Sequence, residues 1–328
     1  MKVLVVGLGA IARRHIRNLK TLDSSIEIAC WRQRTDPAGW QPPKDLPVDR
    51  YIYDASLVWT WQPDAAIIAN PTSMHVETAA TIALSTAHLF VEKPLSDSLK
   101  WVDWLIGDRA RKGLVLMVGY DLRFYQPLIA VKEAIDSGRI GRPLSIRCEV
   151  GQYLPDWRSG RDYRTSVSAR AALGGGVLLE LSHEIDYARW LMGEVASVSA
   201  MTGRLSDLEI DVEDTADILL RFASGAQGSI HMDMTDRSLV RGCRVVGTEG
   251  SLVCGMPTNS AMLWRSGSWD VLTDGQVMDD ALMLEMRHFL ACCRGEAVPP
   301  VDGETARRVL EIALAAKRSA EEKREVEV

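Results

Sequence analysis

The feature that most constrains the fold of this chain is a glycine fingerprint directly behind its first apolar run. Residues 3–6 read Val-Leu-Val-Val, and Gly7-Leu8-Gly9-Ala10-Ile11-Ala12 follows at once and opens a helical pattern. The first glycine allows a tight turn, and the second lets the backbone approach a pyrophosphate, which the N–H groups of a helix N-terminus stabilise. The alternative is a glycine-rich turn between packed elements, but strand, glycines and helix together favour dinucleotide binding. The candidate contacts are Gly7, Gly9, Ala10 and Ile11.

Short β-branched runs alternate with helical stretches over the first third of the chain. This alternation predicts a parallel sheet with crossover helices, an α/β doubly wound domain of the Rossmann type. The expected strands are 2–6, 27–31, 65–69, 88–91 and 114–119, and the expected helices are 11–22, 75–85 and 101–112. Residues 32 to about 54 are expected to form a loop.

The pattern changes near residue 120, which predicts a first domain of residues 1–120 and a second of residues 121–328. The second half carries longer alternating segments, typical of a large, mostly antiparallel sheet with helices on one face, an α+β domain. Its expected strands are 144–151, 195–204, 215–222, 226–233, 241–247 and 250–254. An amphipathic helix is expected over 305–324.

Composition excludes several classes of partner. The chain has 328 residues, of which 25% are charged, and a net charge of −6, which argues against binding to nucleic acid or to a membrane surface. The first apolar run is too short for a signal or membrane segment, so a cytoplasmic location is expected. The six cysteines show no metal-ligand spacing, so we expect reduced thiols and no metal.

The end of the second expected strand bears on the choice of cofactor. An NAD site usually places an acid about twenty residues after the fingerprint, against the ribose 2′-hydroxyl. Here the sequence reads Trp31-Arg32, with Arg34 close behind. Guanidinium groups suit a 2′-phosphate or stack on adenine, which favours NADP over NAD, although arginines of a solvated loop would look the same. Trp31, Arg32 and Arg34 are therefore candidate cofactor contacts.

Two further motifs follow the third and fourth expected strands. Asn70-Pro71-Thr72 follows the third expected strand and leads into a helix that begins near His75. Glu92-Lys93-Pro94 stands where the apolar run of residues 87–91, which contains the fourth expected strand, ends. Ligands bind at the carboxyl ends of strands in open α/β sheets, so both motifs are candidate cofactor contacts and Lys93 is a candidate catalytic group. The alternatives are a solvated strand end for Glu92 and Lys93, and for His75 a polar residue in a first helical turn.

Together with Gly174-Gly175-Gly176 and the polar residues that follow it, these motifs resemble the Gfo/Idh/MocA family of NAD(P)-dependent sugar oxidoreductases, which includes glucose–fructose oxidoreductase and inositol 2-dehydrogenase. The resemblance covers nearly the whole chain. It implies that Lys93 hydrogen-bonds the reacting substrate oxygen and that Glu92 and Pro94 shape the cofactor ribose site. It also implies that the open C-terminal sheet mediates oligomerisation, so a homodimer or homotetramer is expected.

The second catalytic element departs from the family pattern. The family has an Asp followed four residues later by a His, whereas here Glu180 precedes His183 by three. Either spacing puts both side chains on one face of a helix. We take His183 as acid/base or orienter and Glu180 as its companion, with Glu184 as the reserve and a candidate substrate contact. The alternative is a helix whose polar residues are satisfied locally.

A long segment before the glycine triplet interleaves arginines with aromatic residues in an otherwise acidic protein. This pattern suggests capture of a carboxylate or phosphate together with a sugar or base ring. A solvated loop or a subunit contact is the alternative. The candidate substrate contacts are Tyr153, Trp157, Arg158, Arg161, Tyr163 and Arg164.

These features predict hydride transfer between nicotinamide and a hydroxyl or keto carbon of a sugar, including an anionic or nucleotide-linked sugar of surface polysaccharide synthesis. One alternative is an epimerase or dismutase that retains and recycles its cofactor. Another is a non-enzymatic redox sensor that binds NAD(P), although binding alone does not require Lys93.

Overall fold

The computed structural model describes residues 1–32, 41–158, 160–273 and 281–328. The chain divides into two compact units, of which the first comprises Met1–Tyr120 and Leu282–Arg307 and the second Asp121–Ala281 and Arg308–Val328. Residues 282–307 thus belong to the first unit, although the sequence-based division placed everything after residue 120 in a second domain. The reason is local packing, because Phe289 meets Phe90 with ring centroids 5.4 Å apart and Val301 accepts a backbone hydrogen bond from Val118.

The first unit is built on a parallel sheet. Its strands are β1 (Lys2–Val6), β2 (Glu27–Trp31), β3 (Arg50–Ile52), β4 (Ala65–Ile68), β5 (His88–Glu92) and β6 (Leu116–Gly119). Its helices are α1 (Ala10–Leu22), α2 (Ala55–Trp61), α3 (His75–Ala83), α4 (Val102–Arg111) and α8 (Ala281–Cys293). The six strands are ordered β3-β2-β1-β4-β5-β6, which confirms the doubly wound sheet. The sequence missed β3 and α2 because such short elements show too few periods.

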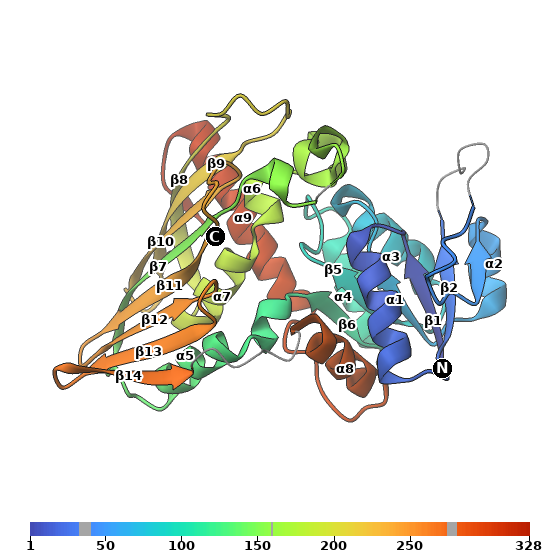
Figure 1. Cartoon of the computed structure of the whole chain (residues 1–328), viewed down its shortest axis with the longest axis horizontal. Helices are drawn as coiled ribbons and strands as arrows, with labels where there is room; N and C mark the ends of the chain where they lie inside the picture. Colours follow the sequence, from blue (N-terminus) through green and yellow to red (C-terminus); the bar gives the residue numbers. More distant parts are fainter. Residues whose placement is uncertain (33–40, 159, 274–280) are drawn as a thin grey trace. The chain divides into compact units, whose positions relative to one another are not determined.

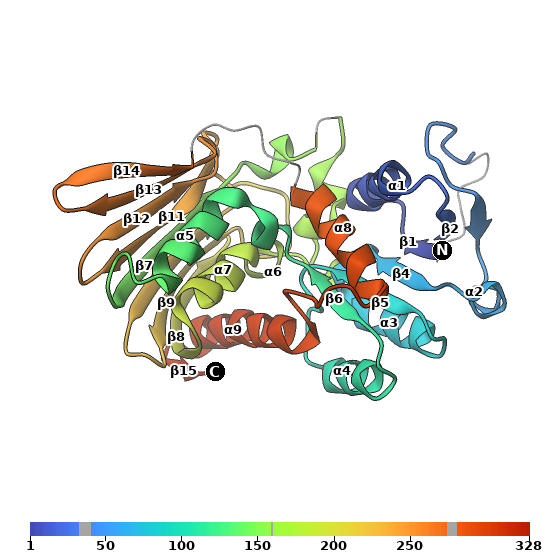
Figure 2. The same cartoon turned by 90° about the horizontal axis from the view of Figure 1, so that it is seen from below.

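Both faces of this sheet are covered. The residues of β4 and β6 are all buried, as expected for parallel strands between two helical layers. On one face Phe90 of β5 meets His15 of α1 and Phe289 of α8, each in an edge-on ring contact. Helices α3 and α4 cover the other face (Figures 1 and 2). The carboxyl ends of β1, β4 and β5 therefore lie along one edge.

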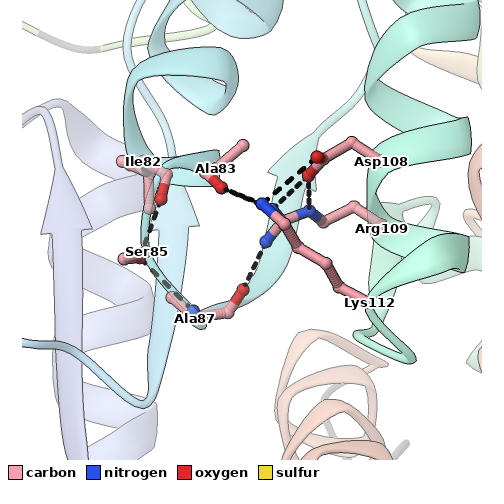
Figure 3. Close-up of polar contacts among 7 residues, drawn as sticks. All are labelled: Ile82, Ala83, Ser85, Ala87, Asp108, Arg109 and Lys112. Carbon is pink, nitrogen blue, oxygen red and sulfur yellow. Dashed lines mark hydrogen bonds and ion pairs between the residues drawn. The ribbon is translucent and has the colours of Figure 1, made fainter.

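A buried arginine fixes the start of β5 (Figure 3). Arg109 of α4 is 1% exposed, and its guanidinium donates to the carbonyls of Ala83, at 2.7 Å, and Ala87, at 3.0 Å. Asp108 accepts from the same group, so the buried charge is paired and hydrogen-bonded. Lys112 donates to the Ala83 carbonyl from the next turn, at 2.8 Å. This cluster ties α4 to the connection between α3 and β5.

The second unit is built on a larger, mixed sheet. Its strands are β7 (Pro143–Gly151), β8 (Val195–Gly203), β9 (Thr215–Phe222), β10 (Gln227–Asp233), β11 (Val240–Gly247), β12 (Ser251–Gly255), β13 (Ser260–Arg265), β14 (Ser268–Thr273) and β15 (Val326–Glu327). They form one nine-stranded sheet, ordered β14-β13-β12-β11-β7-β10-β9-β8-β15. The mostly antiparallel α+β domain is confirmed. The sequence missed β13, β14 and β15.

Helices cover one face of this sheet (Figure 2). They are α5 (Gln126–Asp136), α6 (Val177–Glu180), α7 (His183–Met192) and the part of α9 (Gly303–Glu322) that lies in the second unit. Along β9 buried residues alternate with exposed ones, so the other face is open within this chain. Leu219 is 62% exposed on that face.

One parallel pair interrupts the antiparallel pattern. Strands β7 and β10 run side by side, and Gly151 is opposite Asp233 at their carboxyl ends. The segments that follow these strands therefore leave from the same edge, and Gln152 donates a backbone hydrogen bond to the Asp233 carbonyl. The aromatic and arginine-rich segment begins at this edge.

Candidate active site

The two fingerprint glycines differ in what surrounds them. Gly7 has φ +95°, and a Cβ there would lie 2.6 Å from the Ala69 carbonyl oxygen, so the turn requires glycine. Gly9 is the N-cap of α1, and a Cβ built on it would have no described heavy atom within 4 Å. Open space at a helix N-terminus with no side-chain cap fits a pyrophosphate, and Ala10 and Ile11 are the first helical residues behind it.

The end of β2 carries two of the residues expected near the cofactor, Trp31 and Arg32. Trp31 is the last strand residue and is 5% exposed, so most of its side chain packs inside the unit. Arg32 is half-buried and donates its backbone N–H to Ile52 of β3. Arg34 lies outside the described residues. A contact of Trp31 or either arginine with a cofactor stays a prediction.

His75 ties together the segments that follow β4 and β5. Its Nδ1 lies 2.9 Å from the Pro94 carbonyl and its Nε2 lies 3.0 Å from the Asn70 carbonyl, while Asn70 also donates to Thr78. Burial lowers the pKa of His75, which is 1% exposed, although the two carbonyls favour the charged form. Its position fits a residue that fixes both segments, and a direct contact with a cofactor stays a prediction. Pro71 and Thr72 lie in the segment it holds.

A second histidine fixes the carboxylate beside Lys93. His15 of α1 is fully buried, and its Nε2 lies 2.5 Å from Glu92 Oε1. Its Nδ1 is buried and has no hydrogen-bond partner among the described residues, so the ring proton belongs on Nε2 and is donated to Glu92. The Glu92 side chain is 12% exposed, and Lys93 next to it is half-buried. Sequence reasoning missed His15. Its position was a signal, because a residue three places after Ala12 lies on the same face of the helix, which packs against the sheet.

On the second unit, the first turn of α7 is held by two ion pairs. Glu184 is fully buried and accepts from Arg241 at 2.8 and 3.1 Å. Asp186, also fully buried, accepts from Arg123 at 2.7 and 2.8 Å. Both oxygens of Glu184 are bound to the Arg241 guanidinium, and a contact of Glu184 with substrate stays a prediction. Sequence reasoning missed Arg123 and Arg241, which lie on distant elements.

Glu180 and His183 are not on one helix. The short helix α6 ends at Glu180 and α7 begins at His183, so the expectation that they share a helical face is wrong. Glu180 accepts a hydrogen bond from Ser168 Oγ at 2.9 Å. The His183 side chain is 11% exposed, and its Nε2 lies 3.6 Å from Asp121 Oδ1.

The arginines of the arginine-rich segment differ in their surroundings: Arg164 forms ion pairs, whereas Arg158 and Arg161 are exposed and line a cavity. Arg164 pairs with Asp162 and Glu209, at 2.9 and 3.1 Å. Arg158 and Arg161 are exposed and line a cavity of about 190 Å³, together with Trp157 and other residues of the segment. The remaining lining residues include Leu154, Tyr163, Ser166 and Ser168. Tyr153 lies under Arg237, whose guanidinium carbon is 3.8 Å from the ring centroid.

The doubly wound domain, with an open helix N-terminus after its first strand, and the second α+β unit are typical of a two-domain dinucleotide-binding protein. Two family models match the chain: "Oxidoreductase family, NAD-binding Rossmann fold" over residues 1–120 and "GFO/IDH/MocA C-terminal domain" over residues 128–253. The chain belongs to this GFO/IDH/MocA family, as the sequence motifs predicted.

Individual relatives agree with this assignment. A myo-inositol 2-dehydrogenase of Thermotoga maritima is 31% identical over 100% of this chain and 98% of its own length. A scyllo-inositol 2-dehydrogenase (NAD(+)) of Bacillus subtilis is 29% identical over 97% and 94%. The crystal structure of a probable dehydrogenase from Thermotoga maritima is 29% identical, with a TM-score of 0.80 over 100% of this chain and 98% of that one. A levoglucosan dehydrogenase in complex with NADH and L-sorbose shares the fold, with a TM-score of 0.86 at 22% identity over 100% and 99%.

None of the helices in the described ranges combines the length and apolar character needed to cross a membrane.

Proposed function

We propose that this protein transfers a hydride between a nicotinamide cofactor and a hydroxyl or keto carbon of a sugar or polyol. The observation that carries the proposal is Lys93 at the end of β5, with Glu92 bonded to His15 on one side of it and the Pro94 carbonyl bonded to His75 on the other. A residue that only ended a strand would not need two buried histidines to fix its neighbours. The names of the two inositol dehydrogenases support the same reaction class.

The residues around Gly9 would hold the cofactor. The N–H groups at the start of α1 would bind the pyrophosphate, and Glu92 would accept from a ribose hydroxyl through its second oxygen. When bound, the nicotinamide supplies or accepts the hydride. NADP is slightly favoured over NAD because Arg32 follows β2 and no acid ends that strand, whereas a relative named for NAD(+) supports the other choice.

Lys93 would hydrogen-bond the reacting oxygen, take its proton during oxidation and return it during reduction. Such proton transfer contributes about 10²- to 10⁴-fold in rate when the group is well positioned. His183, presented by the second unit, would serve as acid/base or orienter of the substrate. Glu180, held by Ser168, would support the same region.

The substrate class is proposed to be an anionic sugar, such as a sugar acid or a nucleotide-linked sugar. The support is the cavity of about 190 Å³ whose rim carries Arg158 and Arg161, neither of which forms an ion pair with an acid in the described residues. Trp157 and Tyr163 would pack against a ring, and the guanidinium groups would bind a carboxylate or phosphate. Replacing both arginines with glutamine should raise KM for anionic sugars and leave KM for neutral polyols unchanged.

We also propose that the open face of the nine-stranded sheet joins copies of this chain into a homodimer or homotetramer. Exposed apolar side chains on its strands support this, among them Leu219, which is 62% exposed, and Met201, which is 73% exposed. Light scattering of wild type and of Leu219→Asp would test it. A cytoplasmic location stays a prediction from the sequence.

The experiment that tests the function is a titration followed by a substrate screen. NAD⁺ and NADP⁺ are titrated against the purified protein, and inositols, sugar acids and nucleotide sugars are then screened for a change at the nicotinamide absorbance band. Turnover with one of these groups is the expected result. Failure of both cofactors to bind would overturn the proposal, and cofactor that co-purifies and survives dialysis would instead favour the recycling epimerase.

A further inference from the structure

The placement of His183 depends on a turn far away in the sequence. Arg123 lies in the 3₁₀ turn Asp121–Phe124, and its guanidinium binds Asp186 through both oxygens and lies 4.6 Å from the ring centroid of Trp190. The side chains of Arg123 and Asp186 are 6% and 1% exposed. A buried bidentate pair fixes the two elements against each other. The turn is therefore anchored to the face of α7 that carries His183.

This anchoring presents Asp121 to His183. Asp121 lies two residues before Arg123, and its Oδ1 is 3.6 Å from His183 Nε2. The side chains are 24% and 11% exposed, so the contact is largely shielded from water. The distance is within the range of an ion pair and allows a hydrogen bond after a small rotation of either side chain.

The acid that the sequence pattern paired with His183 is engaged elsewhere. Glu180 ends α6, accepts from Ser168 and is separated from α7 by Leu181 and Ser182. Ser168 is 1% exposed and lines the cavity of the arginine-rich segment, so this partly buried bond ties Glu180 to that segment. The carboxylate that meets the His183 ring comes from the 3₁₀ turn instead.

We propose that Asp121 is the positioning residue of His183 in the reaction proposed above. Asp121 holds the ring through Nε2, which it faces at 3.6 Å, while Nδ1 is buried. A carboxylate that holds one imidazole nitrogen fixes the ring orientation and tautomer and stabilises the imidazolium form. This inference rests on the proposed function for its consequence in catalysis, but the contact itself is a property of the second unit.

The other charged side chains near His183 each form hydrogen bonds with a residue other than His183. Arg241 of β11 binds Glu184, and Arg123 binds Asp186. Glu180 of α6 accepts from Ser168. Asp121 also acts electrostatically on Arg241, but each arginine is bound bidentately to a different acid, so removal of the Asp121 charge should not release a guanidinium.

A titration without substrate tests the contact. In protein labelled with ¹³C-histidine, the His183 signal is assigned by its loss in His183→Gln and followed against pH in wild type and in Asp121→Asn. His183 should titrate at lower pH in the variant, because the imidazolium has lost its carboxylate. An unchanged midpoint in a folded Asp121→Asn variant would overturn the proposal.

Kinetics test the consequence. Asp121→Asn should lower kcat/KM by about 10- to 100-fold and move the acid limb of its pH profile to lower pH, because a mispositioned acid/base loses part of its contribution. Asp121→Glu, which keeps the charge, should recover part of the rate. Asp270→Asn, on an exposed position of β14, is the matched control and should change nothing. A profile that moves with Glu180→Gln and not with Asp121→Asn would assign the role to Glu180. If no substrate is turned over, the proposed function fails while the titration still decides the contact.

Discussion

The two units hold their candidate site residues by different means. In the first unit, the segments around Lys93 are fixed by buried histidines, since His75 lies within hydrogen-bond distance of two backbone carbonyls and His15 is bonded to Glu92. In the second unit, the first turn of α7 is fixed by buried ion pairs, from Arg123 and Arg241. In the first unit His15 of α1 lies 77 residues from Glu92, and His75 of α3 lies 19 residues from Pro94. In the second unit Arg123 and Arg241 lie 63 and 57 residues from their acids, so both units depend on partners that are distant in the chain.

This difference predicts different failures on substitution. A hydrogen bond to a neutral group contributes about 0.5–1.5 kcal/mol, whereas removing one partner of a buried ion pair costs about 3–5 kcal/mol because the other charge stays buried. Loss of Arg123 or Arg241 should therefore lower the free energy of unfolding more than loss of His15 or His75 does.

The largest effect is expected at Lys93. Lys93→Met should lower turnover by about 10²- to 10⁴-fold, because the group that moves the hydroxyl proton is lost. Cofactor affinity should be retained, since the glycine turn and Glu92 remain. Single-turnover kinetics and calorimetric titration with cofactor measure the two quantities. Lys44→Met, at an exposed site of the same unit, is the control, and intact turnover in Lys93→Met would exclude the proposed role.

The second largest effect is on the stability of the second unit. Arg123→Met leaves Asp186 buried without its guanidinium and should lower the free energy of unfolding by about 3–5 kcal/mol. Arg265→Met removes an exposed pair with Glu249 and should cost less than about 1 kcal/mol. Denaturant unfolding compares them. Equal effects of the two substitutions would show that burial does not set the cost of losing an ion-pair partner in the second unit.

A smaller effect separates the two glycines of the first unit. Gly7→Ala meets the Ala69 carbonyl at positive φ and should lower the free energy of unfolding by about 1–3 kcal/mol. Gly9→Ala meets nothing within 4 Å and should leave stability unchanged while it weakens cofactor binding. Unfolding curves and cofactor titrations for both variants test this. A destabilised Gly9→Ala would contradict the open space at the start of α1.

The smallest effects are opposite pH dependences of two histidines. Burial lowers the pKa of His75 below its ordinary 6.5, so its contribution to stability is present above pH 6.5 and is lost as the pH falls through the lowered value. For His231 of β10, burial alone would lower the pKa, but Asp217 and Asp233 outweigh it and raise the pKa. Its contribution is present below pH 6.5 and is lost as the pH rises through the raised value.

Stability measured from pH 5 to pH 8 should therefore change slope in opposite directions in His75→Gln and His231→Gln, each compared with wild type. Slopes of the same sign would show that one of the two environments differs from the structure.

The sequence by itself determined the doubly wound first unit, the family and the positions of the glycine turn and of Lys93. These follow from local chemistry, because a tight turn needs glycine and a strand end presents the residues next to it in the chain. It also predicted a mostly antiparallel second sheet from alternation alone. It missed β3, α2, the edge strands β14 and β15, and β13 next to β14, which are short or lie beyond the clearest periodicity.

Only the tertiary structure decided what surrounds His183. The sequence spacing of Glu180 and His183 suggested one helical face, but the helix breaks between them and Asp121 approaches instead. It also placed residues 282–307 with the first unit. Contacts between residues far apart in the chain depend on how strands and helices pack, and no local pattern encodes which distant arginine will neutralise a buried acid.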